Sequence, residues 1–184
     1  MRTLVLGGIR SGKSLWAESF IAQSEISAPC VRYVATGAVP DNDDAWVRRV
    51  ADHRDRRPPT WSTVESVDVA GSLRSDPDTP TIVDDLGGWL TAVLDRRGWT
   101  GAPIDAEVDD LLAAIGETAA DLVLVSPEVG LTVIPATESG RRFADELGAL
   151  NQRLADRCQQ VVLVVAGQPL WIKRCVGDSM TAGI

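Results

Sequence analysis

The sequence predicts a three-layer α/β fold with a doubly wound, mostly parallel sheet between layers of helices. Short segments rich in Val, Ile and Leu alternate with longer helix-like segments along the chain. These apolar segments lack a strict apolar/polar alternation, which is typical of parallel strands buried on both faces. A glycine-rich stretch follows the first of them. In such folds ligands bind at the carboxyl ends of the strands, where this stretch is expected to lie.

The elements follow one another as strand and helix in turn. The expected strands are residues 3–6, 31–35, 81–84, 122–126 and 161–166. The expected helices are residues 13–23, 43–53, 89–97, 106–119 and 139–158. Prolines at 58–59 and within 75–80 indicate loops. A chain of 184 residues suffices for one compact domain but not for two of full size, so we expect a single domain over residues 1–184.

Composition excludes several classes of function. The formal net charge of −8 opposes binding to a nucleic acid backbone, so no nucleic acid partner is expected. No apolar run approaches the 18 residues that cross a bilayer, so we expect a cytoplasmic protein without a membrane span. Three widely spaced cysteines, without histidines at metal-ligand spacing, favour reduced thiols over a disulfide framework or a zinc site.

A phosphate-binding loop is the strongest motif. The stretch fits G-x-x-x-x-G-K-[ST] directly after the first strand, and it comprises Gly7, Gly8, Ile9, Arg10, Ser11, Gly12, Lys13 and Ser14. Its glycines let backbone N–H groups approach phosphates, and the following helix points its positive dipole end at them. We expect Lys13 to reach the β- and γ-phosphates and Ser14 to be a ligand of Mg²⁺.

A second metal ligand is expected at the end of a neighbouring strand. Asp84 follows an apolar run directly and is the better candidate, with Asp85 as the alternative. A helix N-cap is the competing interpretation, and it suits Asp85 better than Asp84.

The single histidine, His53, lies in an arginine-rich segment. Arg48, Arg49, Arg54, Arg56 and Arg57 fall within ten residues of an otherwise acidic chain. Arginine is suited to bidentate phosphate contacts. A neutral imidazole beside such arginines is able to attack phosphorus as a nucleophile. The alternatives are a structural or surface histidine on a solvated basic helix face.

Together these pieces resemble the bifunctional adenosylcobinamide kinase / adenosylcobinamide-phosphate guanylyltransferase family of cobalamin biosynthesis, over nearly the whole length. The matching segments are the phosphate loop with Ala17-Glu18, Tyr33-Val34-Ala35-Thr36, His53 through Trp61 with Glu65, Val125-Ser126, Glu128-Val129-Gly130-Leu131, and Asn151-Gln152-Arg153-Leu154-Ala155. The combination is specific, whereas the phosphate loop alone is not.

The resemblance implies a P-loop fold, usually a homotrimer, and two reactions. A nucleoside triphosphate, ATP or GTP, phosphorylates the corrinoid adenosylcobinamide. GTP then guanylylates a histidine, which falls on His53, and the GMP passes to adenosylcobinamide phosphate to give adenosylcobinamide-GDP. Beyond the loop, the residues that the resemblance implies as GTP contacts are Ala35, Thr36, Gly37, Arg54, Asp55, Arg56, Arg57, Glu65 and Asp84.

The sequence departs from the family pattern at several positions. Pro127 stands where an Asn is common and removes a side-chain amide and a backbone donor. Thr132 replaces a Gly, Ala136 replaces a Glu, and residues 85–88 differ from the more usual Cys-Leu-Thr. Three other functions stay open: a single-function small-molecule kinase, a nucleotide-binding module without chemistry, and a regulatory GTPase. The GTPase is suggested by a D-x-x-G match at Asp84, but the chain lacks N-K-x-D.

Overall fold

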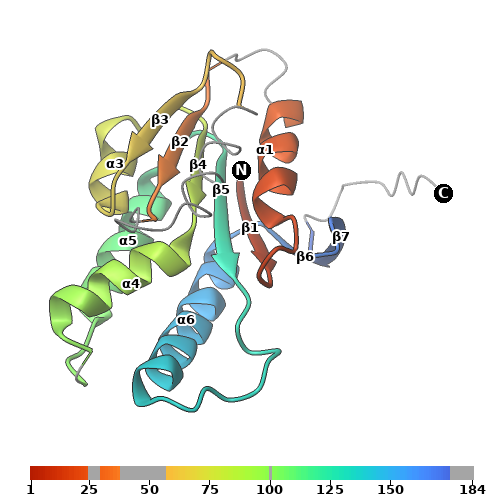
Figure 1. Ribbon diagram of the computed structural model, residues 1–184. Coiled ribbons are helices and arrows are strands. Elements are labelled where there is room, and N and C mark those ends of the chain that lie inside the picture. Colours follow the sequence, from red (N-terminus) through yellow and green to blue (C-terminus); the bar gives the residue numbers. More distant parts are fainter. Residues whose placement is uncertain (25–29, 38–56, 100, 175–184) are drawn as a thin grey trace.

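A computed structural model describes residues 1–24, 30–37, 57–99 and 101–174 of the chain. One seven-stranded sheet forms its centre, in the order β3-β2-β4-β5-β1-β6-β7 (Figure 1). The strands are β1 (Arg2–Gly7), β2 (Arg32–Ala35), β3 (Ser62–Glu65), β4 (Thr81–Asp84), β5 (Leu122–Pro127), β6 (Gln160–Val165) and β7 (Gln168–Lys173). All neighbouring pairs are parallel except β6 and β7, which form an antiparallel hairpin. The predicted α/β fold with a mostly parallel sheet is confirmed.

Helices cover both faces of the sheet. They are α1 (Lys13–Ser24), α3 (Val69–Ser75), α4 (Leu86–Arg97), α5 (Asp105–Glu117) and α6 (Glu138–Arg157). In Figure 1, α1 lies on one side of the sheet, and α3, α4 and α5 lie on the other. Within the described residues none of the helices is long and apolar enough to cross a membrane.

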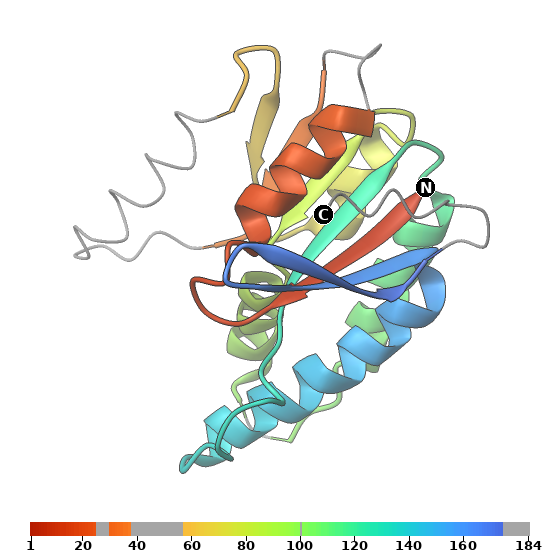
Figure 2. The same cartoon turned by 90° about the vertical axis from the view of Figure 1, so that its right-hand side faces the viewer.

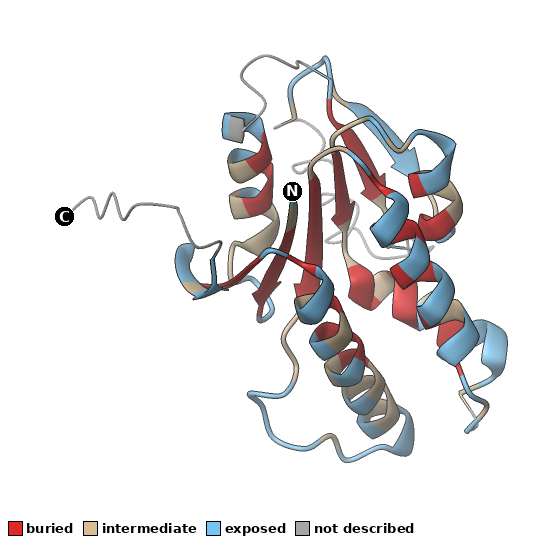
Figure 3. Cartoon of the chain, turned by 180° about the vertical axis from the view of Figure 1, so that it is seen from behind, coloured by how far each residue is buried: buried red, intermediate tan, exposed pale blue. Residues whose placement is uncertain are grey.

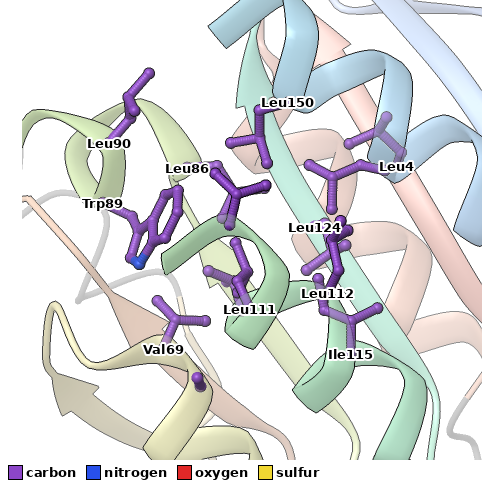
Figure 4. Close-up of a cluster of buried hydrophobic side chains, with 14 of the residues drawn as sticks. Leu4, Val69, Leu86, Trp89, Leu90, Leu111, Leu112, Ile115, Leu124 and Leu150 are labelled. Atoms are coloured by element: carbon purple, nitrogen blue, oxygen red, sulfur yellow. The ribbon is translucent and has the colours of Figure 1, made fainter. Parts of the chain in front are cut away.

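Two hydrophobic clusters follow from the pleat of the strands, because successive residues of a strand point to opposite faces. In β1, Leu4 and Leu6 pack into the cluster under α3, α4, α5 and α6, part of which Figure 4 shows. Val5 points the other way, into the cluster under α1. Helix α6 contributes a buried stripe at helical spacing while its other side is exposed (Figure 3), and the stripe consists of Leu147, Leu150, Asn151 and Leu154.

The predicted strands are all present, within two residues at each end. The expected helix at 43–53 lies outside the described residues. Helix α4 begins at Leu86 rather than at residue 89, because the Asp85 side chain caps it by accepting a hydrogen bond from Gly88 N at 2.9 Å. Three elements were not predicted, namely β3, β7 and α3. Both of these strands are largely exposed, and the helix has only seven residues.

Candidate nucleotide site

The glycine-rich loop joins β1 to α1 at the carboxyl edge of the sheet. Gly12 adopts φ +90°, a conformation that favours glycine, just before α1 begins at Lys13. Ser11 N donates to Gly8 O at 3.2 Å and Trp16 N donates to Gly12 O at 2.9 Å, so the loop turns tightly into the helix. The N-terminus of α1 therefore faces the space above the sheet, where it favours an anion.

Two other segments donate backbone hydrogen bonds to this loop. Gly167 N, in the turn between β6 and β7, donates to Ser11 O at 2.8 Å, and Figure 2 shows the hairpin beside the loop. Glu128 N, just after β5, donates to Gly7 O at 3.0 Å. A Cβ built on Gly12 would lie 3.1 Å from Gly167 Cα, so the loop and the hairpin are in close contact.

Asp84 ends β4 and faces the start of α1. Ser14 Oγ donates to Asp84 Oδ1 at 3.2 Å, and the Tyr33 hydroxyl donates to Asp84 Oδ2. Strand β5 separates β4 from β1 in the sheet, yet the two proposed metal ligands meet above it. Burial, followed by the Asp84 charge, raises the pKa of the Tyr33 phenol far above its usual value. Tyr33 therefore remains a hydrogen-bond donor.

A hydroxyl and a carboxylate are the oxygen ligands that Mg²⁺ takes in nucleotide sites, so the pair fits that ion. The described residues contain no group of three or more His, Cys, Asp or Glu arranged to hold a metal. The pair of Ser14 and Asp84 suits an ion that is held by two side chains together with substrate phosphates.

Asp85, next to Asp84, is the N-cap of α4. Its carboxyl caps α4, and its pKa is raised by burial first and by the Asp84 charge second, while Lys13 and the amides of the first helical turn lower it. The interpretation of Asp85 as an N-cap is therefore confirmed.

The remaining predicted contacts divide into three groups. Thr36 lies at the end of β2, where its N–H donates to Asp84 O at 3.1 Å, next to Ala35 and the exposed Gly37. Glu65 is exposed at the end of β3, in register with Ala35. His53, Arg54, Asp55 and Arg56 lie outside the described residues.

Arg57 is held inside the protein. Its guanidinium carbon lies 3.3 Å from the centroid of the Tyr33 ring, and Nη1 donates to Thr63 Oγ1 at 3.1 Å. Its side chain is 9% exposed, and Nε lies 3.9 Å from Glu18 Oε1, too far for a hydrogen bond. The sequence predicts a nucleotide contact for Arg57, but no pattern in it indicates the contact with Tyr33.

Pro127 and its neighbours have clear structural partners. A Cβ on Gly87 would lie 2.8 Å from Pro127 Cγ, so the glycine in the first turn of α4 makes room for the proline. Asn151 Nδ2 donates to Pro127 O at 3.1 Å, and Ser126 Oγ donates to Asn151 Oδ1 at 2.6 Å. Gly87 is also the glycine of the D-x-x-G match, and it is buried in the helix. Helix packing therefore accounts for that match.

Comparison with known proteins identifies close relatives. Residues 3–172 match the model of the family described as cobinamide kinase / cobinamide phosphate guanyltransferase. The bifunctional adenosylcobalamin biosynthesis protein CobP of Pseudomonas aeruginosa is 41% identical, over 94% of this chain and 98% of its own length. The proteins CobU of Salmonella typhimurium and Escherichia coli, described in the same words, are 35% and 34% identical over 94% of this chain and all of their own length.

Proposed function

Because this chain belongs to the cobinamide kinase / cobinamide phosphate guanyltransferase family, we propose that it catalyses both reactions of that name on adenosylcobinamide. In the first, a nucleoside triphosphate gives its γ-phosphoryl group to the aminopropanol hydroxyl of the corrinoid and leaves as the diphosphate. In the second, the phosphorylated corrinoid takes GMP from GTP, with loss of pyrophosphate. The product is adenosylcobinamide-GDP.

The contact between Ser14 and Asp84 carries this proposal on the structural side. In a P-loop enzyme, the hydroxyl of the loop and an acid from a neighbouring strand together hold the metal of the metal–nucleotide complex. Their oxygens lie 3.2 Å apart at the start of α1. When bound, Mg²⁺ neutralises phosphate charge and so makes phosphorus a better electrophile.

The loop residues have complementary tasks. Backbone N–H groups of the loop and the N-terminus of α1 bind phosphate oxygens, and Lys13 stabilises the charge that develops on them. Ser11 Oγ is buried without a hydrogen-bond partner in the described part of the chain. A buried hydroxyl in such a loop favours a site completed by a ligand.

His53 acts as the nucleophile of the guanylyl transfer. A nitrogen of its neutral imidazole attacks the α-phosphorus of GTP, a P–N bond forms, and the bond to pyrophosphate breaks. The phosphate of the corrinoid then attacks the same phosphorus and releases the imidazole. The neighbouring Arg54 and Arg56 are suited to binding the triphosphate during these steps.

Covalent labelling tests the proposal. The protein is incubated with [α-³²P]GTP and Mg²⁺, denatured and analysed for bound label. We expect a label that is labile to acid and stable to base, as a phosphoramidate is, and that leaves the protein when adenosylcobinamide phosphate is added. Because His53 is the only histidine, its loss in His53→Asn must abolish the label. A protein that binds GTP but takes up no label would overturn the guanylyl transfer.

The kinase reaction needs a separate test. With [γ-³²P]ATP or [γ-³²P]GTP and adenosylcobinamide, wild type and His53→Asn should both phosphorylate the corrinoid, and the ratio of the two rates gives the preferred donor. Asp84→Asn should lose this reaction in proportion to its loss of metal affinity. Phosphorylation that fails in wild type while histidine labelling succeeds would limit the chain to the second reaction.

A homotrimer is the assembly we propose, by resemblance to the family. The strand β7 supports self-association, because it presents large apolar side chains and, among the residues that the structure describes, an edge that pairs with no further strand. Leu170 and Ile172 are 61% and 60% exposed there. Sedimentation equilibrium should give three times the chain mass, and a monomer at all concentrations would contradict the proposal.

A further inference from the structure

Tyr33 lies in an unusual position for a tyrosine of the sheet. It is 2% exposed and packs on the α1 face among the apolar residues of the smaller cluster. A buried phenol needs a hydrogen-bond partner, and here the partner is the Asp84 carboxylate. Phenylalanine would fill the same space without this requirement, so the hydroxyl has a role that packing alone does not explain.

The Asp84 carboxylate is held at both oxygens by hydroxyl groups from different elements. Ser14 of α1 donates to Oδ1 and Tyr33 of β2 donates to Oδ2. Rotation about the last bond of an aspartate side chain is broad and weakly restricted when it is free. Two donors on opposite oxygens therefore fix the plane of this carboxylate. Each oxygen retains a further lone pair for a metal or for its bound water.

Arg57 in turn holds the phenol ring. Its guanidinium group covers the face of the ring at 3.3 Å and is tied to β3 through Thr63. Such a contact between a cation and an aromatic ring is strongest where both groups are out of water, as they are here. The three side chains form a continuous series from Arg57, which precedes β3, through Tyr33 of β2 to the carboxylate at the end of β4.

We propose that Tyr33 is a positioning residue for the metal–nucleotide complex, that its hydroxyl sets the orientation of the Asp84 carboxylate, and that Arg57 holds it in place. The proposal rests on the proposed function, since it takes Asp84 to be a ligand of the nucleotide-bound metal. Tyr33 itself touches neither the metal nor the substrate. Its effect is transmitted through Asp84.

Metal affinity, measured apart from catalysis, tests the proposal. Mn²⁺ replaces Mg²⁺, the nucleotide is a GTP analogue with a methylene α–β bridge, which blocks transfer to His53, and free Mn²⁺ is measured by electron paramagnetic resonance without corrinoid. We expect Tyr33→Phe to weaken Mn²⁺ binding about tenfold, with the affinity for the metal-free analogue nearly unchanged. In the kinase assay the same variant should require more Mg²⁺ for half-maximal rate.

A matched control removes a different buried hydroxyl. Thr118 is 4% exposed and donates to Ala114 O at 3.0 Å, with no role in the nucleotide site. Thr118→Val should lower the thermal midpoint and leave Mn²⁺ affinity at the wild-type value. Wild-type Mn²⁺ affinity in Tyr33→Phe would overturn the positioning role, and equal weakening in both variants would overturn it as well.

A second variant tests the part played by Arg57. Arg57→Met keeps an apolar stem over the ring and removes the guanidinium group, so Mn²⁺ binding should weaken by a smaller factor than in Tyr33→Phe. If Arg57 acts through Tyr33, the double variant binds Mn²⁺ as Tyr33→Phe does, and additive losses would contradict this. A wild-type protein that binds no Mn²⁺ with the analogue, or takes no label from GTP, would refute the proposed function first.

Discussion

Gly12 and Gly167 meet where the phosphate loop rests on the β6–β7 turn, and both have positive φ, +90° and +77°. Their surroundings differ. A Cβ on Gly12 would lie 3.1 Å from Gly167 Cα, whereas a Cβ on Gly167 would meet nothing within 4 Å. A side chain at either position would strain the backbone, but only a side chain at Gly12 would also press against the neighbouring segment.

We expect Gly12→Ala to weaken GTP binding about 100-fold, because strain and the close approach both displace the loop. Gly167→Asn should change the affinity by less than about threefold, since Asn tolerates the left-handed region and this site is open. Isothermal titration calorimetry with Mg²⁺ and a GTP analogue whose α–β bridge is a methylene group measures both. Equal losses in the two variants would mean that the contact at Gly12 does not govern the shape of the loop.

Two cysteines of the described chain differ in their burial. Burial raises the pKa of the Cys158 thiol to about 12, although Lys173 and Arg2 lower it in part. Cys30 is exposed. At pH 8 the Cys158 thiol is therefore almost entirely protonated, and the thiolate is the reactive form.

Iodoacetamide at pH 8 should therefore modify Cys30 and leave Cys158 unmodified until the protein unfolds. Mass spectrometry of the peptides reads each cysteine separately, and addition of guanidinium chloride gives the control in which both react. Because the folded pKa is raised, the folded state is also expected to lose stability as the pH rises above the unfolded pKa of this thiol. Rapid modification of native Cys158 at pH 8 would contradict the buried position.

At the scale of elements, α4 and β5 meet through a glycine and a proline. A Cβ on Gly87 would lie 2.8 Å from Pro127 Cγ and 3.1 Å from Asp85 Oδ1. In an unhindered helix, replacement of glycine by alanine stabilises by about 0.5–1 kcal/mol. The contact with Pro127 reverses that preference at this position.

We expect Gly87→Ala to lower the free energy of unfolding by about 1–3 kcal/mol through this overlap. Gly148→Ala is the matched control in α6, where a Cβ would meet nothing within 4 Å, and it should raise the free energy by about 0.5–1 kcal/mol. Urea denaturation measures both. In a Pro127→Ala background the loss at Gly87 should largely disappear, and its persistence would show that Pro127 is not the obstacle.

Buried strands could be predicted from the sequence, whereas exposed edge strands could not. Strands β1 and β4 are buried on both faces, so their apolar runs identify them directly. β3 is exposed at all four residues and contains no apolar run, and β7 contains a proline, so neither has the pattern of a buried strand. Such edge strands depend on pairing with a neighbour, which a local sequence pattern does not contain.

The candidate site divides in the same way. Lys13 and Ser14 follow from a local motif, and Asp84 follows from its place after an apolar run. The contact of Tyr33 with Asp84, and of Arg57 with Tyr33, joins residues 51 and 24 positions apart across β2, β3 and β4. These contacts depend on the register of the strands and on which face each side chain occupies. Asp84 and Arg57 were predicted from the sequence as site residues, but Tyr33 was not, and no sequence pattern indicates that the three side chains touch.

Across the whole molecule, segments far apart in the sequence meet at the candidate nucleotide site. The loop after β1 is supported by the turn after β6, through Gly167 N and Ser11 O at 2.8 Å (Figure 2). Binding a triphosphate to the loop should reduce its opening motions, and a hydrogen bond to the loop shares that effect. The amide of Gly167 in the hairpin turn is thus expected to exchange more slowly when a nucleotide is bound, although the hairpin contributes no proposed ligand.

Amide hydrogen exchange tests this coupling. We expect Mg²⁺ and GTP to slow exchange at Gly167 about tenfold, together with amides of the phosphate loop, and to leave the exposed amides of α5, on the opposite face of the sheet, unchanged. The control is Lys13→Ala, in which nucleotide at the same concentration should give no protection at either place. Protection of the loop without protection of Gly167 would show that the hairpin supports the loop without responding to the nucleotide.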